Sequence, residues 1–159
     1  MEITILIFLF GGLFLGWSLG ANDAANVFGT AVGTRMVSFT SAAIVCSIFV
    51  ILGAIISGAG TTETLGKLGA INALPGAFAA CVAAGVSVYL MTKVGLPVST
   101  TQAIVGAIVG WNLYTGSSTN IQVLMTILAT WIICPIIAGI IAMGLFTFTK
   151  KVILNRKLH

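Results

Sequence analysis

Two short polar segments interrupt an otherwise apolar sequence, and their residue types are those that bind ions. The first segment, residues 20–30, holds Asn22, Asp23 and Asn26. Asp23 is the only acidic residue inside an apolar stretch, where a carboxylate is costly and usually pairs with a cation. Carboxylate and amide oxygens suit a hard cation such as Na⁺. The segment therefore predicts a cation site at these three residues, with Na⁺ suited to the oxygens of Asp23 and Asn26.

The second segment, residues 95–101, contains residue types that bind an anion without a basic side chain. Gly95 and Pro97 mark a chain reversal followed by a helix start, and the first turn then holds Ser99, Thr100 and Thr101. The N-terminus of a helix carries unsatisfied N–H groups and a partial positive charge, to which hydroxyl groups add donors. We therefore expect these three hydroxyl residues to bind an oxyanion.

Both segments also have plainer interpretations. Asn and Asp commonly cap a following helix, so Asn22 and Asp23 also fit a helix end at the membrane interface. The residues around them are small and are compatible with an unwound segment or with close helix packing: Gly20, Ala21, Ala24 and Ala25. In the second segment one hydroxyl suffices for a helix cap, and three in succession exceed that need.

The composition places both segments in a membrane protein. Of 159 residues, 58% are hydrophobic and 6% are charged, whereas a soluble domain carries about 25% charged residues. This excludes an ordinary soluble protein, a disordered chain and a collagen-like chain. We expect no nucleic-acid binding, because a basic stripe is missing, and no cofactor beyond a bound ion. An enzyme is not expected, since Asp23 and the terminal His159 cannot form an acid–base pair.

Hydropathy divides the sequence into five apolar stretches of about the length that a helix needs to cross a bilayer. They cover residues 3–19, 39–57, 74–92, 96–113 and 121–148, and a polar loop is expected at 58–69. We therefore predict an all-α polytopic membrane protein with two broken or re-entrant helices, one at each polar segment. Residues 1–149 are expected to form one membrane domain, and residues 150–159 a basic cytoplasmic tail.

The basic residues predict how these stretches are oriented. If all five cross the membrane, Arg35, Lys93 and the basic tail fall on one side, and Lys67 falls on the other. Because basic residues concentrate in cytoplasmic loops, we expect the N-terminus outside and the C-terminus inside a plasma membrane. A re-entrant fourth stretch would instead place the tail outside, which the charges disfavour.

The two polar segments resemble the paired signatures of the PiT family of inorganic phosphate transporters. The resemblance rests on residues 20–34, which begin Gly-Ala-Asn-Asp-Ala-Ala-Asn, and on residues 95–106, which begin Gly-Leu-Pro-Val-Ser-Thr-Thr. It implies uptake of inorganic phosphate coupled to Na⁺ or protons. Gln102 stands where many relatives have histidine, so no proton-relay role is expected there.

The resemblance also implies roles for the site residues and a partner. Asp23 and Asn26 correspond to the cation- and substrate-binding segment, with Asn22 adjacent, and the hydroxyl residues 99–101 correspond to the phosphate-binding segment. Family members typically carry two such units in opposite orientation, and this sequence resembles the N-terminal unit, one half of an inverted repeat. The expected partners are inorganic phosphate, membrane lipid, and a second half, subunit or copy of the chain.

Two alternatives stay open at this point. One is a sulfate transporter of the same fold, because sulfate is also a tetrahedral oxyanion. The Asn22-Asp23 pair favours phosphate, which at neutral pH has a proton to donate to a carboxylate, whereas sulfate has none. The other alternative is a non-transporting or truncated membrane subunit, which the short length of the sequence favours.

Overall fold

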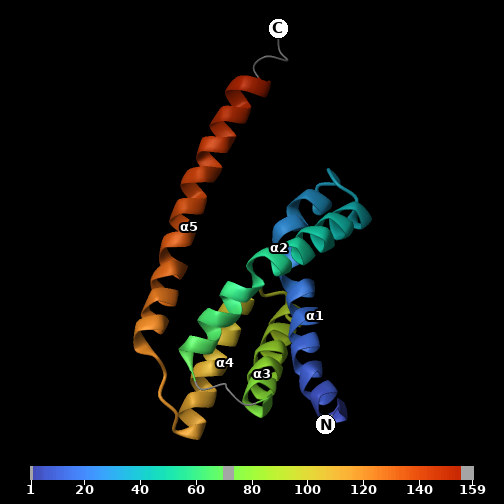
Figure 1. Cartoon of the computed structure of the whole chain (residues 1–159). Helices are drawn as coiled ribbons and strands as arrows, with labels where there is room; N and C mark the ends of the chain where they lie inside the picture. Colours follow the sequence, from blue (N-terminus) through green and yellow to red (C-terminus); the bar gives the residue numbers. More distant parts are fainter. Residues whose placement is uncertain (1, 70–73, 155–159) are drawn as a thin grey trace. The chain divides into compact units, whose positions relative to one another are not determined.

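The computed structural model describes residues 2–69 and 74–154, and all regular structure in these ranges is helical, which confirms the all-α prediction. Five α-helices are followed by a short π-helical turn (Figure 1): α1 (Glu2–Gly33), α2 (Phe39–Leu68), α3 (Leu74–Lys93), α4 (Thr100–Thr115), α5 (Ile121–Thr149) and η1 (Lys150–Leu154). The chain forms two compact units, residues 1–120 and 121–159, which are described separately. The single membrane domain over residues 1–149 stays a prediction.

The first helix is unbroken where the sequence predicted a break. α1 continues from Glu2 to Gly33 through the whole of residues 20–30, so the expectation of a broken helix in this segment is wrong. In an apolar environment every backbone polar group needs a partner, and a continuous helix supplies these partners within one segment. The alanines of the segment favour a helix. Its small residues also allow close helix packing, the second of the two possibilities that the sequence offered for them.

α2 is also longer than the sequence predicted, because the loop expected at residues 58–69 is helical up to the end of α2. The Thr62 hydroxyl donates a hydrogen bond to the Gly58 carbonyl oxygen one turn earlier, so it is satisfied within the helix. Glu63 and Lys67 form an ion pair one turn apart on the exposed surface. These polar side chains therefore bond along the helix and do not end it.

The second polar segment is the chain reversal that the sequence predicted. α3 ends in a Schellman arrangement, in which the Leu96 N–H bonds to the Met91 carbonyl oxygen at 2.9 Å. Gly95 has a φ of 76°, which glycine adopts without steric strain. The chain then runs to Ser99, whose hydroxyl caps α4 by accepting the Gln102 N–H at 3.3 Å. The two caps together determine where α4 begins.

Among the described residues, four helices are long and apolar enough to cross a membrane: α1, α2, α3 and α5. α4 has 16 residues, which gives a length of about 24 Å against a hydrocarbon core of about 30 Å. The fourth apolar stretch, residues 96–113, is therefore a short linker followed by a short helix. The helix break predicted at residues 95–101 is present, whereas the break predicted at residues 20–30 is absent.

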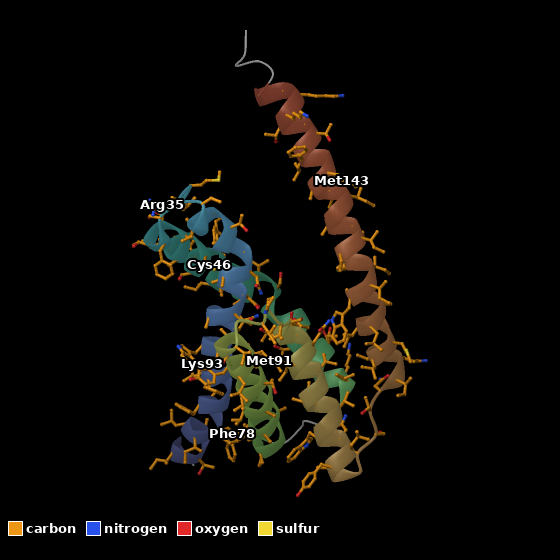
Figure 2. All side chains as sticks on the ribbon, turned by 180° about the vertical axis from the view of Figure 1, so that it is seen from behind. Arg35, Cys46, Phe78, Met91, Lys93 and Met143 are labelled. Carbon is orange, nitrogen blue, oxygen red and sulfur yellow. The ribbon has the colours of Figure 1, made fainter. Side chains whose placement is uncertain are left out.

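α1 and α3 pack closely because glycines remove side chains from their contact. A Cβ atom at Gly85 of α3 would lie 2.7 Å from the Phe14 ring of α1. A Cβ atom at Gly11 of α1 would lie 2.8 Å from the ring of Phe78, which is labelled on α3 in Figure 2. Phe78 also meets Phe8 edge to face, with ring centroids 5.7 Å apart. At both positions a glycine faces an aromatic ring of the other helix. This close packing sets the distance between α1 and α3.

Replacing Gly85 by valine is expected to lower the stability of the unit by about 1–3 kcal/mol, because the added methyl groups have to displace the Phe14 ring. The measurement is thermal unfolding of the purified chain in detergent micelles. The matched control is Gly12→Val on α1, where an added Cβ meets no atom within 4 Å. Equal unfolding temperatures for the two variants would contradict the close packing described above.

α5 and η1 form the second unit, which is apolar over most of its length. No residue of α5 is buried within the unit. A helix that is apolar and exposed on all sides is typical of a surface that contacts lipid or other membrane helices. Lys150 and Lys151 of η1 begin the predicted basic tail. Residues 155–159, which hold the rest of that tail, lie outside the described residues.

Candidate functional site

The side-chain amide of Asn22 joins α1 to α3 and to the linker before α4. Its Nδ2 donates to the Val98 carbonyl oxygen at 2.6 Å and to Asp23 Oδ1 at 2.8 Å. Its Oδ1 lies 3.4 Å from Thr92 Oγ1 and 3.5 Å from the Val98 backbone nitrogen. Asn22 is 4% exposed, so these contacts lie inside the unit. The residue expected only to support a cation site is therefore the link between three parts of the fold.

Asp23 lies beside the first residue of α4. Thr100 Oγ1 donates to Asp23 Oδ1 at 3.3 Å, and Thr100 is 5% exposed. The Asp23 side chain itself is half-buried, so it contacts the protein and also remains accessible. The two polar segments are thus adjacent in space, although 77 residues separate Asp23 from Thr100.

The other three predicted site residues, Asn26, Ser99 and Thr101, are exposed. Ser99 and Thr101 flank Thr100 at the start of α4, and Asn26 lies one turn beyond Asn22 on α1. The structure therefore brings Asn22, Asp23 and Thr100 into direct contact and leaves the other three residues open on the surface of the unit. Which ion each residue binds stays a prediction.

The start of α4 has the donors that an oxyanion needs. The Ser99 carbonyl oxygen accepts the Ala103 N–H at 3.0 Å, and the Ser99 hydroxyl accepts the Gln102 N–H. The N–H groups of Thr100 and Thr101 come earlier, where a helix offers no carbonyl partner. Together with the nearby hydroxyls and the positive end of the helix dipole, these N–H groups can hold an anion without Lys or Arg.

Sequence reasoning missed two hydroxyl residues near the Asn22 amide. Thr92 contacts Asn22 Oδ1 and also donates to the Val88 carbonyl oxygen at 2.8 Å. Ser18, one turn before Asn22, is 1% exposed, and its hydroxyl has no hydrogen-bond partner. The available signal was a hydroxyl residue one turn before each polar segment, inside stretches that the hydropathy pattern assigned to apolar helix.

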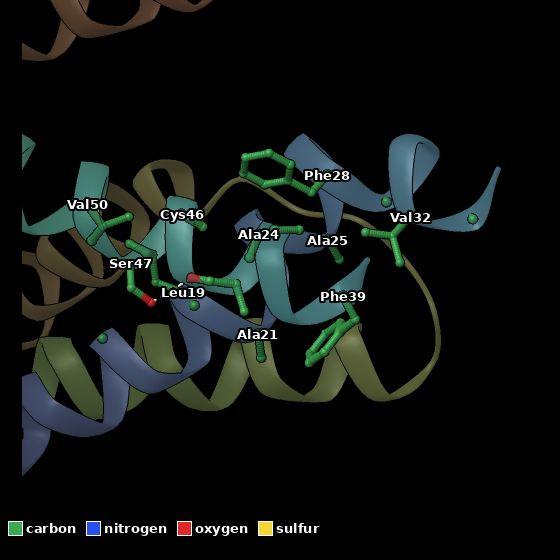
Figure 3. A pocket seen from close by; sticks show the side chains of 16 residues that line it. Leu19, Ala21, Ala24, Ala25, Phe28, Val32, Phe39, Cys46, Ser47 and Val50 are labelled. Atoms are coloured by element: carbon green, nitrogen blue, oxygen red, sulfur yellow. Dashed lines mark hydrogen bonds between the residues drawn. The ribbon is translucent and has the colours of Figure 1, made fainter. Parts of the chain in front are cut away.

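A cavity of about 780 Å³ lies between α1 and α2 (Figure 3), away from this site. On α1 its lining includes Gly20, Ala24 and Phe28, which lie one turn apart, but leaves out Asn22, Asp23 and Asn26. The lining is apolar apart from Cys46 and Ser47 of α2, and the Ser47 hydroxyl already donates to a carbonyl oxygen of its own helix. A cavity without free donors is unsuited to an oxyanion, so it is not the candidate site.

Comparison with known proteins points to one family. The sequence profile of the phosphate transporter family matches residues 19–159. A candidate phosphate permease of Thermococcus kodakarensis is 35% identical over 167 aligned residues, which cover 99% of this chain and 41% of that protein. A sodium-dependent phosphate transporter of Plasmodium falciparum is 34% identical over 156 residues, which cover 91% of this chain and 23% of that protein.

The fold has a match among solved structures as well. A sodium-dependent phosphate transporter superposes with a TM-score of 0.83 at 29% identity, over 98% of this chain and 41% of that chain. The chain thus spans about two fifths of the length of these two relatives. The family match covers both polar segments and the helices that bring them together. The chain therefore belongs to the phosphate transporter family, a family of multi-pass membrane proteins.

Proposed function

We propose that this chain forms one half of a cation-coupled phosphate symporter. Ser99, Thr100 and Thr101 hold the phosphate oxygens together with the N–H groups at the start of α4. Asp23 supplies the negative charge for the coupling cation, and Asn22 and Asn26 supply amide oxygens or orient the site. The family match supports phosphate as the substrate, and two matched proteins are named as sodium-dependent transporters, which supports Na⁺ over a proton.

The observation that carries this proposal is the 3.3 Å contact between Thr100 Oγ1 and Asp23 Oδ1. An anion bound by Thr100 lies close to the Asp23 carboxylate, and two like charges about 5 Å apart repel by roughly 3 kcal/mol at an effective dielectric constant near 20. A cation held at Asp23 converts this repulsion into attraction. Phosphate and cation therefore bind together more favourably than either binds alone, which is the basis of symport.

The experiment is uptake of labelled phosphate into proteoliposomes that contain the complete transporter assembly. We expect uptake to require an inward Na⁺ gradient and to persist in a tenfold excess of sulfate, in line with about ten- to hundredfold selectivity from one proton donated to a site acceptor. Uptake that sulfate abolishes would favour the sulfate alternative. Absence of any substrate-dependent flux would favour a non-transporting subunit.

The combined variant Ser99→Ala, Thr100→Ala is expected to raise the phosphate concentration at half-maximal uptake by about 10- to 100-fold, since hydrogen bonds to a charged ligand are lost. Ser99→Ala also removes the cap of α4, which by itself costs about 1 kcal/mol of stability. The matched control is Ser38→Ala, because Ser38 caps α2 in the same way, accepting the Ser41 N–H at 3.2 Å. An unchanged half-saturation in the double variant would refute the assignment of the phosphate site.

We also propose that a second half, subunit or copy completes the site in a plasma membrane. The support is that Asn26, Ser99 and Thr101 are exposed in this chain, and that the chain covers 41% of the matched transporter structure. The orientation proposed from the charges keeps the N-terminus outside and the C-terminus in the cytoplasm. Phosphate handling in this arrangement needs no enzymatic step.

A further inference from the structure

The partly open cavity between α1 and α2 is suited to an apolar occupant. Its lining offers water few hydrogen bonds, because the Ser47 hydroxyl already donates to the Ala43 carbonyl oxygen at 2.8 Å and the Cys46 thiol is a weak donor. An apolar cavity stays dry, and space beside apolar helices in a membrane is filled by lipid chains or by another helix. The sequence of the lining indicates which of these two fills it.

α1 lines the cavity with glycines that the described contacts of this chain do not require. Gly16 and Gly20 form one G-x-x-x-G pair, and Gly29 and Gly33 form a second. A Cβ atom at any of the four would meet no atom within 4 Å, whereas Gly11 is required by the contact with α3. Glycine weakens a helix relative to alanine, so four such positions on one helix are unfavourable unless another element approaches them closely.

The facing wall of the cavity is also made of short side chains. Ala42, Ala43 and Cys46 of α2 lie across from Ala24 of α1 (Figure 3). Small residues on both walls let the backbone of a third helix come close, which is how helices commonly pack against one another in membranes. A lipid chain does not require glycine, since it fills the space beside larger side chains equally well. The residue types therefore favour a helix over lipid.

The length of the cavity also fits a helix. Its lining on α1 extends from Gly16 to Gly33, and at 1.5 Å per residue this distance is about 26 Å, close to the hydrocarbon core of about 30 Å. One inserted side chain cannot fill a groove of this length. A membrane-spanning helix that lies along α1 can fill it.

The proposed second half is the source of such a helix. This chain covers 41% of the matched transporter structure, so more than half of that structure lies beyond the matched part. A copy of this chain in the opposite orientation fits less well, because its basic residues, among them Arg35 and Lys93, would then face outward, against the usual distribution of positive charge.

We infer that the cavity between α1 and α2 is the docking groove for a membrane-spanning helix of the second half, one that presents a row of large aliphatic or aromatic side chains. A charged side chain is not expected in that row, because the groove offers it no free partner. The inference rests on the proposed function, from which it takes the second half. It adds where that half binds, at the turns of α1 that carry Asn22 and Asp23 outside the lining.

The test is photo-cross-linking in the complete assembly, with Phe28 of α1 replaced by p-benzoylphenylalanine. Phe28 lines the cavity and is already aromatic, so the probe adds one benzoyl group. We expect a cross-link to a peptide of the second half, identified by mass spectrometry after digestion. Phe39 of α2 also lines the cavity and is the second probe. The matched control is the same replacement at Phe10, which is exposed on α1 outside the lining and is expected to give lipid products.

Filling the groove from α1 is expected to displace the docked helix. Gly20→Leu places its side chain in open space, so the chain alone should keep its unfolding temperature within a few degrees. In the assembly we expect the cross-link from Phe28 to fall about tenfold or more, because the leucine competes for the same space. The matched control is Gly110→Leu on α4, where a Cβ atom also meets nothing within 4 Å and which is outside the lining. Its cross-link yield is expected to stay within about twofold of the wild type.

Three results would overturn the inference. One is cross-linking of Phe28 and Phe39 to lipid alone, which would assign the groove to an acyl chain. Another is a cross-link to a second copy of this chain or within this chain. The third is an undiminished yield in Gly20→Leu.

Phosphate uptake by the same assembly separates this inference from the proposed function. If uptake is normal and the probes reach only lipid, the docking groove is wrong and the symporter proposal stands. If the probes reach the second half and no phosphate is taken up, the docking groove stands and the symporter proposal fails.

Discussion

Replacing Asp23 by asparagine is expected to reduce cation-coupled phosphate uptake by about 100-fold or more. Asparagine keeps the size of the side chain and can still accept hydrogen bonds from Asn22 and Thr100 through its carbonyl oxygen. What it removes is the negative charge, which attracts a cation about 5 Å away by roughly 3 kcal/mol at an effective dielectric constant near 20. The variant therefore separates the charge of Asp23 from its place in the hydrogen-bond network.

The measurement is initial uptake of labelled phosphate by the complete assembly in proteoliposomes under a fixed Na⁺ gradient. The matched control is Glu63→Gln, because Glu63 is an exposed acid paired with Lys67 on α2 and is outside the site. We expect the control to transport like the wild type and Asp23→Asn to keep the wild-type unfolding temperature within a few degrees. Wild-type uptake by Asp23→Asn would remove Asp23 from the coupling mechanism.

Replacing Asn22 by leucine is expected to lower the free energy of unfolding by about 3 kcal/mol and to abolish uptake. Leucine has the same branching at Cγ as asparagine, with bulkier methyl groups, but it donates nothing to the Val98 carbonyl oxygen and to Asp23, which Asn22 bonds at 2.6 Å and 2.8 Å. Without these bonds the linker before α4 loses its link to α1, and Thr100 is no longer held against the carboxylate. Stability and transport are therefore expected to fall together.

Chemical denaturation in micelles, followed by tryptophan fluorescence, measures the change in stability. Asn26→Leu is the matched control for this quantity, because it is the same substitution one turn further along α1 at an exposed position. We expect its effect to stay within about 0.5 kcal/mol, as for most surface substitutions. If Asn22→Leu unfolds at the same denaturant concentration as Asn26→Leu, Asn22 is not the link between α1 and the linker.

The sequence predicted helices best where apolar stretches end at strong signals. The predicted stretch 74–92 corresponds to α3, Leu74–Lys93, which ends at the Gly95 reversal. The predicted stretch 121–148 corresponds to α5, Ile121–Thr149. The Ser99 cap was also predictable, because a hydroxyl residue after proline is a typical helix start.

The errors arose where polar and small residues continue a helix. Residues 20–30 and 58–69 have the composition of breaks, yet both are helical in α1 and α2. Glycine, threonine and asparagine have only weak preferences against helix, and the need to pair every backbone group in an apolar environment outweighs them. Side-chain bonds such as that from Thr62 to Gly58 depend on the helix and cannot be read from composition.

For the site, the residue types predicted the chemistry but not the full set of contacts. The contact between Asp23 and Thr100 joins the segment predicted to bind a cation to the segment predicted to bind an anion. The contacts of Thr92 and the burial of Ser18 depend on how α3 packs against α1, which one sequence does not reveal. Hydroxyl residues inside apolar helices usually bond to their own backbone, as Ser87 does. Their presence in the sequence therefore does not mark them as site residues.

The two glycine contacts between α1 and α3 restrict how these two helices can move relative to each other. At Gly11 and Gly85 an aromatic ring of the other helix occupies the space that a Cβ atom would take, so the two helices are closely packed at both positions. A side chain at either glycine would have to displace the Phe78 or Phe14 ring, so the present packing of the two helices depends on both glycines. We therefore expect α1 and α3 to move as one rigid body. In the proposed transporter, a change in access to the site would then require bending elsewhere, at the 94–99 linker or where α2 meets α1.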